Sequence, residues 1–183
     1  MVIEHPTPDN AVLVIVDVQG KLARLMHQSE AMIGQQRILI EGCRLLDVPV
    51  VWAEQLPEKL GPTVPELVEK LDGLKPLAKA SFGCCGDQGL REAIRSSRRQ
   101  QVLLCGIEAH VCVWQTAAGL RRDGYPVHLI CDAVSARSEF NRDVAFRRME
   151  AAGVALSNVE MVLFELMQTA EHPRFRDVSR LLR

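Results

Sequence analysis

A regular alternation of short apolar segments with longer segments of helical periodicity constrains this chain more than any other feature. The apolar segments cover residues 11–16, 49–53, 74–78, 101–105, 126–131 and 154–156. Helical spacing marks residues 29–46, 66–71, 89–99, 109–122, 142–152 and 158–169. Short β-branched runs without polar alternation are typical of strands buried on both faces of a sheet. Strands that alternate with helices form right-handed βαβ units, so the pattern predicts a parallel sheet in a three-layer α/β/α domain.

Two stretches of this pattern are weaker than the rest. Residues 55–65 contain three prolines and a glycine and are expected to form a loop. Lys75 and Pro76 make residues 74–78 a poor strand, because proline donates no ladder hydrogen bond. No repeat, low-complexity tract or linker interrupts the 183 residues. We therefore expect residues 1–183 to form a single domain.

Composition and charge exclude several classes of protein. Hydrophobic residues make up 48% and charged residues 25%, which is the balance of a globular protein rather than of a disordered chain, fibre or coiled coil. Lys and Arg number 22 against 23 Asp and Glu, for a formal charge of −1. This charge creates no general attraction for a nucleic acid or an anionic membrane. Aromatic residues make up only 4%, which argues against a base-stacking surface. We expect neither kind of partner.

The six cysteines indicate a reduced, cytoplasmic protein. They stand at positions 43, 84, 85, 105, 112 and 131, too few and too often within apolar runs for a disulfide scaffold. Residues 1–10 lack the basic and apolar regions of a secretory signal. The cysteines at 43, 105 and 131 are expected in the core. Cys84 and Cys85 have no second pair at zinc-ligand spacing, so we expect them to line or neighbour a pocket.

Chemistry is expected where the predicted strands end, because open parallel sheets bind ligands beyond the carboxyl ends of their strands. Asp17 follows the first strand, Lys79 the third, and Cys112 lies in the first turn of the helix after the fourth. Unpaired N–H groups at that turn and the Lys79 ammonium group are expected to lower the pKa of the thiol, with Asp17 as general base. A buried structural cysteine fits the same spacing, so the residues alone leave both interpretations open.

Three segments together resemble the isochorismatase-like cysteine hydrolases. They are residues 14–19 (VIVDVQ), residues 79–82 (KASF) and residues 106–113 (GIEAHVCV). Residues 54–55 and 60–67 resemble the branch of that family without a bound metal. The resemblance extends over about residues 10–165.

The resemblance implies a six-stranded parallel sheet and a catalytic triad. The triad would consist of Asp17 as base, Lys79 as the residue that positions thiolate and base, and Cys112 as nucleophile. It also implies a cis peptide bond between Ile107 and Glu108, and an oxyanion hole formed by the backbone N–H groups of Glu108 and Cys112. The implied reaction is hydrolysis of a small amide through a thioester, with no cofactor.

Other activities remain open on the sequence. Relatives that bind a metal carry an aspartate and two histidines after the second strand, whereas residues 52–57 contain neither. No metal is therefore expected, and nicotinamide becomes a less fitting substrate. Isochorismatase-type vinyl ether hydrolysis would need Asp17 and Lys79 but not Cys112. A third alternative is a non-catalytic oligomeric binding protein that retains the triad.

Several further residues are expected around a small-molecule pocket or at an interface. The expected pocket wall consists of Gln19, Leu22, Trp52, Gln55, Phe82 and Trp114. His110 lies two positions before Cys112, and side chains at that spacing point apart by about 200° on a helix, which disfavours a direct Cys–His pair. Residues 161–167 are apolar almost all round, which favours either burial within the domain or a homo-oligomer.

Overall fold

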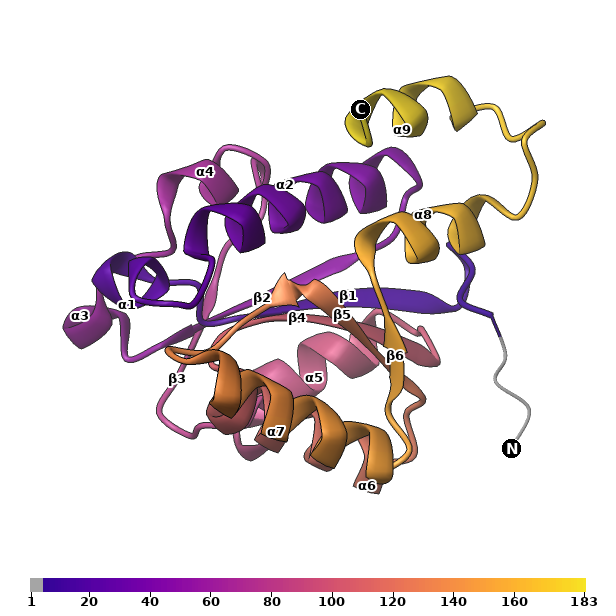
Figure 1. Cartoon of the computed structure of the whole chain (residues 1–183). Helices are drawn as coiled ribbons and strands as arrows, with labels where there is room; N and C mark the ends of the chain where they lie inside the picture. Colours follow the sequence, from indigo (N-terminus) through magenta and orange to yellow (C-terminus); the bar gives the residue numbers. More distant parts are fainter. Residues whose placement is uncertain (1–4) are drawn as a thin grey trace.

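A six-stranded parallel sheet in the order β3-β2-β1-β4-β5-β6 forms the centre of the computed structural model, which describes residues 5–183 (Figure 1). The strands are β1 Ala11–Val16, β2 Val50–Gln55, β3 Leu77–Lys79, β4 Gln101–Gly106, β5 Val127–Val134 and β6 Ala155–Ser157. Residues 1–4, which form part of the segment inspected for a secretory signal, lie outside the described residues. The α/β fold with six parallel strands is confirmed.

Helices cover both faces of this sheet. The helices are α1 Gly20–Arg24, α2 Ser29–Leu45, α3 Pro57–Leu60, α4 Pro65–Val68, η1 Cys84–Gly86, α5 Gln88–Ser96, η2 Ala109–Val113, α6 Trp114–Arg122, α7 Glu139–Ala151, α8 Val159–Met167 and α9 Phe175–Leu181. Figure 1 shows α2, α4, α8 and α9 on one side of the sheet, and α5, α6 and α7 on the other. None of the helices within residues 5–183 combines the length and the apolar character needed to cross a membrane.

Strand β1 fixes the position of the site. All six of its residues are buried, because an uninterrupted apolar run suits a strand covered on both faces. Leu13 pairs with Val50 of β2 on one side and with Leu103 of β4 on the other. The chain thus builds the sheet outward in two directions from β1, and such a reversal opens a crevice at the carboxyl ends of the strands.

The structure departs from the sequence expectations mainly where the elements are short. The expected loop at residues 55–65 contains the single-turn helix α3. Strand β3 begins only at Leu77, after Pro76. The expected helix at residues 109–122 begins as a π-helical turn, η2. Helices α1 and α9 were not expected, because elements of five and seven residues carry little periodicity.

All six cysteines are free. Cys43 and Cys105 are fully buried in the core, and Cys84 and Cys85 are buried beside α6. Cys131, expected in the core, is only half-buried on β5.

Gly106 ends β4 in a conformation that only glycine adopts easily. Its φ is +123°, and an added Cβ would lie 2.1 Å from the Val16 carbonyl oxygen. We expect Gly106→Ala to lower the free energy of unfolding by more than about 2 kcal/mol, because strain and a backbone clash combine. Urea unfolding measures this change. The matched control is Gly34→Ala in α2, where no atom lies within 4 Å of the added Cβ, and where stability should rise by about 0.5–1 kcal/mol. Equal unfolding midpoints for the two variants would contradict the argument.

Candidate active site

Four buried polar side chains converge at the carboxyl ends of the strands. Asp17 follows β1, Gln55 ends β2, Lys79 ends β3, and Cys112 lies in η2 after β4. Their exposed fractions are 2%, 7%, 3% and 8%. The structure therefore brings the three proposed catalytic side chains together, with Gln55 among them.

Lys79 is held by a ring of oxygen atoms. Its Nζ donates to Asp17 Oδ2 at 2.6 Å and to Gln55 Oε1 at 3.0 Å. It also lies within hydrogen-bonding distance of the carbonyl oxygens of Phe82 at 2.9 Å and Ser81 at 3.1 Å. A buried ammonium group is stabilised in this way by an ion pair and by additional acceptors. The same contacts fix the segment after β3 against the site.

Cys112 lies next to this ion pair and shares one of its partners. The thiol donates to Gln55 Oε1 at a distance of 3.4 Å from sulfur to oxygen. Asp17 Oδ2 is engaged by Lys79, whereas Asp17 Oδ1 is buried and has no hydrogen-bond partner among residues 5–183. The carboxyl group therefore has one oxygen atom left for a proton.

Burial has the largest effect on the pKa values of the Asp17 carboxyl and the Cys112 thiol. It raises the pKa of the Asp17 carboxyl, and the Lys79 ammonium group opposes this shift. Burial also raises the pKa of the Cys112 thiol; the Asp17 carboxylate raises it further, and Lys79 opposes both. The sequence expectation of a lowered thiol pKa is therefore wrong. Loss of solvent and a neighbouring negative charge outweigh the lysine, so the resting thiol is neutral.

The turn that carries Cys112 begins with unusual backbone geometry. The peptide bond between Ile107 and Glu108 is cis. The N–H groups of Val111 and Val113 both donate to the Glu108 carbonyl oxygen, at 3.0 and 3.2 Å. The Glu108 N–H donates no backbone or side-chain hydrogen bond within the described part of the chain. The Cys112 N–H is the fourth of η2, so it belongs to the group that ordinarily lacks a partner in its own helix.

A pocket of about 270 Å³ opens onto these groups. Its lining comprises Asp17, Leu22, Gln55, Leu56, Lys59, Leu60, Phe82, Ile107, Glu108, Val111 and Cys112. Three residues of the expected wall, Leu22, Gln55 and Phe82, are among them. The expectation missed the contribution of α3, although Pro57 at its first position is a known helix-start signal.

Three residues of the expected wall do not line this pocket. Gln19 is fully buried and joins two backbone segments: its Nε2 donates to the carbonyl oxygens of Gln55 and Gly61, and its Oε1 accepts from the Gln55 N–H. Trp52 lies three residues before Gln55, and an odd spacing turns it to the opposite face of the sheet. There its indole N–H donates to Thr63 at 2.7 Å.

Trp114 is the third residue that lies outside this pocket. The Arg148 guanidinium group stacks on its ring at 4.5 Å from the ring centroid. Trp114 lines a neighbouring hollow of about 340 Å³ together with Phe82 and Cys85. Cys85 therefore neighbours the site, as expected. His110 is not among the lining residues of the pocket that opens onto Cys112.

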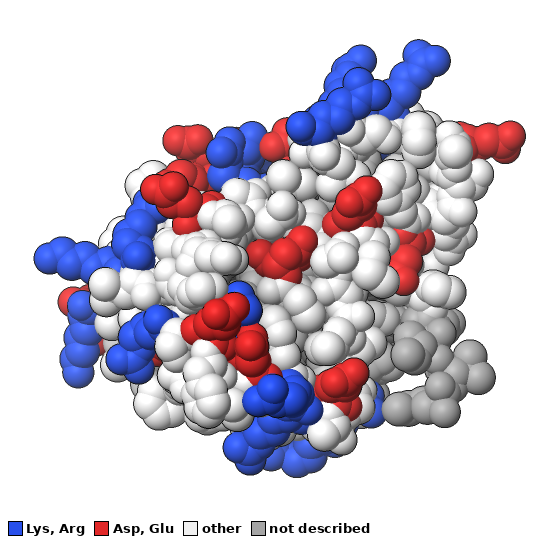
Figure 2. Space-filling view, in the orientation of Figure 1, with Lys and Arg blue, Asp and Glu red and all other residues white. Residues whose placement is uncertain are grey.

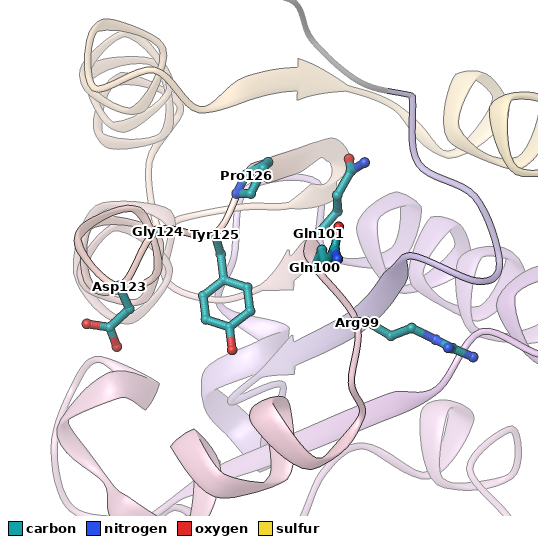
Figure 3. Close-up of a pocket in the computed structure, with 7 residues that line it drawn as sticks. All are labelled: Arg99, Gln100, Gln101, Asp123, Gly124, Tyr125 and Pro126. Carbon is teal, nitrogen blue, oxygen red and sulfur yellow. The ribbon is translucent and has the colours of Figure 1, made fainter.

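A further hollow, of about 420 Å³, lies at the opposite end of the strands. It is lined by residues from the segments that precede β4 and β5, and Figure 3 shows Arg99 and Asp123 on opposite sides of it. Asp123 pairs with Arg91 at 3.2 Å. Within residues 5–183, no cluster of three or more His, Cys, Asp or Glu side chains is arranged to hold a metal ion.

The model of the Isochorismatase domain matches residues 11–161. This chain belongs to the isochorismatase family. It is 40% identical to isochorismatase domain-containing protein 2 of Danio rerio over 94% of this chain and 86% of that protein. It is 35% identical to the secreted isochorismatase effector Isc1 of Phytophthora sojae, over 96% of this chain and 86% of that protein.

Several solved structures share the fold of this isochorismatase-family hydrolase. The MAR1 ribonuclease of Caenorhabditis elegans superposes with a TM-score of 0.92 at 37% identity, covering 98% of this chain and 92% of that one. The ycaC gene product of Escherichia coli, an octameric hydrolase of unknown specificity, superposes with a TM-score of 0.89 at 20% identity, covering 100% and 96%.

Proposed function

We propose that this isochorismatase-family hydrolase cleaves a small amide, with Cys112 as nucleophile and Asp17 as the group that moves the proton. One observation carries the proposal: Asp17 and Cys112 line the same pocket, Lys79 holds Asp17 Oδ2 beside it, and Asp17 Oδ1 has no hydrogen-bond partner among residues 5–183. A structural ion pair would not need a neighbouring thiol, and a structural cysteine would not need an open pocket. Their combination favours nucleophilic catalysis.

The first half of the reaction transfers the acyl group to sulfur. As Sγ bonds to the carbonyl carbon, Asp17 Oδ1 accepts the thiol proton. The carbonyl electron pair moves to oxygen, and the N–H groups of Glu108 and Cys112 stabilise the resulting charge. The C–N bond then breaks while Asp17 returns the proton to nitrogen, so that ammonia or an amine leaves a thioester on Cys112.

The second half regenerates the thiol. Asp17 accepts a proton from water as the water oxygen bonds to the thioester carbon. The C–S bond breaks, the carboxylic acid leaves, and the sulfur recovers the proton from Asp17. A base adjacent to a neutral nucleophile accomplishes both halves without a thiolate in the resting state.

Lys79 and Gln55 act on this reaction by positioning. The Lys79 ammonium group holds Asp17 Oδ2 and leaves Oδ1 for proton transfer. The Gln55 amide oxygen accepts from both Lys79 and Cys112, and its Nε2 donates to the Ala80 carbonyl oxygen at 2.9 Å. Because every polar atom of this side chain is engaged within the protein, Gln55 orients the thiol, and substrate contact falls to Leu22, Phe82 and their apolar neighbours.

A second candidate function is vinyl ether hydrolysis of the isochorismatase type. Burial raises the pKa of Asp17, which favours a protonated carboxyl group able to donate to the vinyl carbon. In that reaction Cys112 is dispensable. If the protein is instead a non-catalytic oligomer that retains the triad, neither activity is expected.

The name of one relative suggests RNA as another substrate to consider. The C. elegans relative bears the name of a ribonuclease. Here the formal charge is −1, and Figure 2 shows basic and acidic side chains interspersed over the face that it displays. The displayed face lacks the basic stripe that usually attracts RNA, and we propose no nucleic-acid partner.

The deciding experiment compares three substrates: a panel of small primary amides, isochorismate and single-stranded RNA. Ammonia release together with an acyl adduct on the Cys112 peptide supports the proposed function. Carbonyl product from isochorismate without an adduct favours the second candidate, and RNA cleavage at a matching rate contradicts both. Inactivity toward all three favours the non-catalytic oligomer.

We further propose that residues 1–183 act as one domain, without a metal or other cofactor, in a cytoplasmic homo-oligomer. All six strands join one sheet, and the six free thiols fit a reducing compartment. Helix α8 buries Val162 and Leu163 inward but leaves Met161 and Phe164 exposed by 49% and 41%. Light scattering of the purified protein tests the oligomer.

A further inference from the structure

We infer that Lys59 forms an anion subsite at the pocket mouth, so that the substrate is a small amide bearing one carboxylate or similar acidic group. This inference names the substrate class of the proposed function. Asp17 and Lys79 neutralise each other at 2.6 Å, and Glu108 pairs with Arg137 at 2.8 Å. Lys59 is the one charged lining residue without an ion-pair partner within residues 5–183.

The rest of the pocket lining fits a substrate that has an apolar body between two polar ends. Asp17, Gln55 and Cys112 are buried, whereas Lys59 is exposed. Apart from these residues and Glu108, the lining is aliphatic or aromatic, from Leu22, Leu56, Leu60, Phe82, Ile107 and Val111. A volume of about 270 Å³ lies near the lower limit for ligand pockets. It suits a body of about one ring or a short aliphatic chain.

The backbone that carries Lys59 is held in place, which limits the entropy lost on binding. The Leu56 N–H donates to the Lys79 carbonyl oxygen at 2.9 Å, which joins the start of α3 to the end of β3. The Gln19 side chain donates to the Gly61 carbonyl oxygen at 2.7 Å, just beyond the end of α3. Gly20 packs so closely on Leu60 that an added Cβ would lie 2.5 Å from its carbonyl oxygen.

The test compares matched pairs of amides that differ in one carboxylate: succinamate with butanamide, glutaramate with pentanamide, and 4-carboxybenzamide with benzamide. Isothermal titration of the Cys112→Ala variant measures affinity without turnover. We expect the carboxylated member of at least one pair to bind more tightly, by about tenfold at low salt, as for a partly desolvated ion pair. Lys59→Met should remove this preference, and Lys59→Arg should keep most of it.

Lys75→Met is the control, because Lys75 is exposed and precedes β3, at the other end of the strand from the pocket. It should preserve the preference for the carboxylated member. Equal affinities within every pair, absence of binding, or an equal loss in Lys59→Met and Lys75→Met would overturn the inference. Failure of the proposed function is a different result: wild-type protein binds the carboxylated amides through Lys59 but releases no ammonia.

Discussion

Replacing Cys112 with alanine is expected to reduce amide hydrolysis by at least about 10³-fold. The sulfur atom is the only protein group in the proposed mechanism that bonds to the acyl carbon, so its removal leaves no route through a covalent intermediate. The thiol is small and 8% exposed, so its loss should cost stability on the order of 1 kcal/mol. Ammonia release and a thermal unfolding curve on the same preparation separate the two effects. Cys112→Ser should be almost as inactive, because serine is a weaker nucleophile at the same position.

Cys131→Ala provides the matched control for this experiment. Cys131 is a free, half-buried thiol on β5, outside the lining of the pocket at Cys112. Its variant should hydrolyse the amide at the wild-type rate. Wild-type turnover by Cys112→Ala would eliminate the thioester mechanism, and full vinyl ether hydrolysis by the same variant would favour the second candidate function.

The rim of the sheet was predictable from the sequence because strand ends are local features. Asp17 and Lys79 each follow an apolar run, and parallel strands place their carboxyl ends on one edge. Once the alternation of strands and helices is recognised, the two residues and Cys112 must lie on that edge. Only one strand, β2, lies between β1 and β3 in the sheet. The side chains of Asp17, which follows β1, and Lys79, which ends β3, are therefore near enough to meet.

The pocket wall was less predictable because it depends on side-chain direction and on short elements. Trp52 and Gln55 belong to one strand, yet their spacing sends them to opposite faces, which a search of strand ends overlooks. Lys59 belongs to a helix of four residues, too short to show periodicity. The pKa of Cys112 depends on burial and on the distance to Asp17, neither of which sequence spacing supplies.

Asp17→Asn is expected to move the reactivity of Cys112 and the rate of amide hydrolysis in opposite directions. The Asp17 carboxylate raises the thiol pKa and Lys79 opposes it. The uncharged asparagine therefore lowers that pKa. Alkylation of Cys112 by iodoacetamide should begin at lower pH than in the wild type, whose midpoint lies above the ordinary value of about 8.5. Amide hydrolysis should nevertheless fall about 10²–10⁴-fold, because no group remains to protonate the leaving nitrogen.

Lys79→Met should shift the same alkylation profile to higher pH, since it removes the charge that opposes the rise. Either single variant leaves a buried charge without its partner, at a cost of about 3–5 kcal/mol in stability. The double variant Asp17→Asn/Lys79→Met removes both charges and should recover much of that stability while remaining inactive. Peptide mass spectrometry across a pH series, with Cys131 as internal reference, gives the profiles. Parallel shifts in Asp17→Asn and Lys79→Met would show that the two residues affect Cys112 through general destabilisation, whereas opposite shifts require that their charges act directly on the thiol.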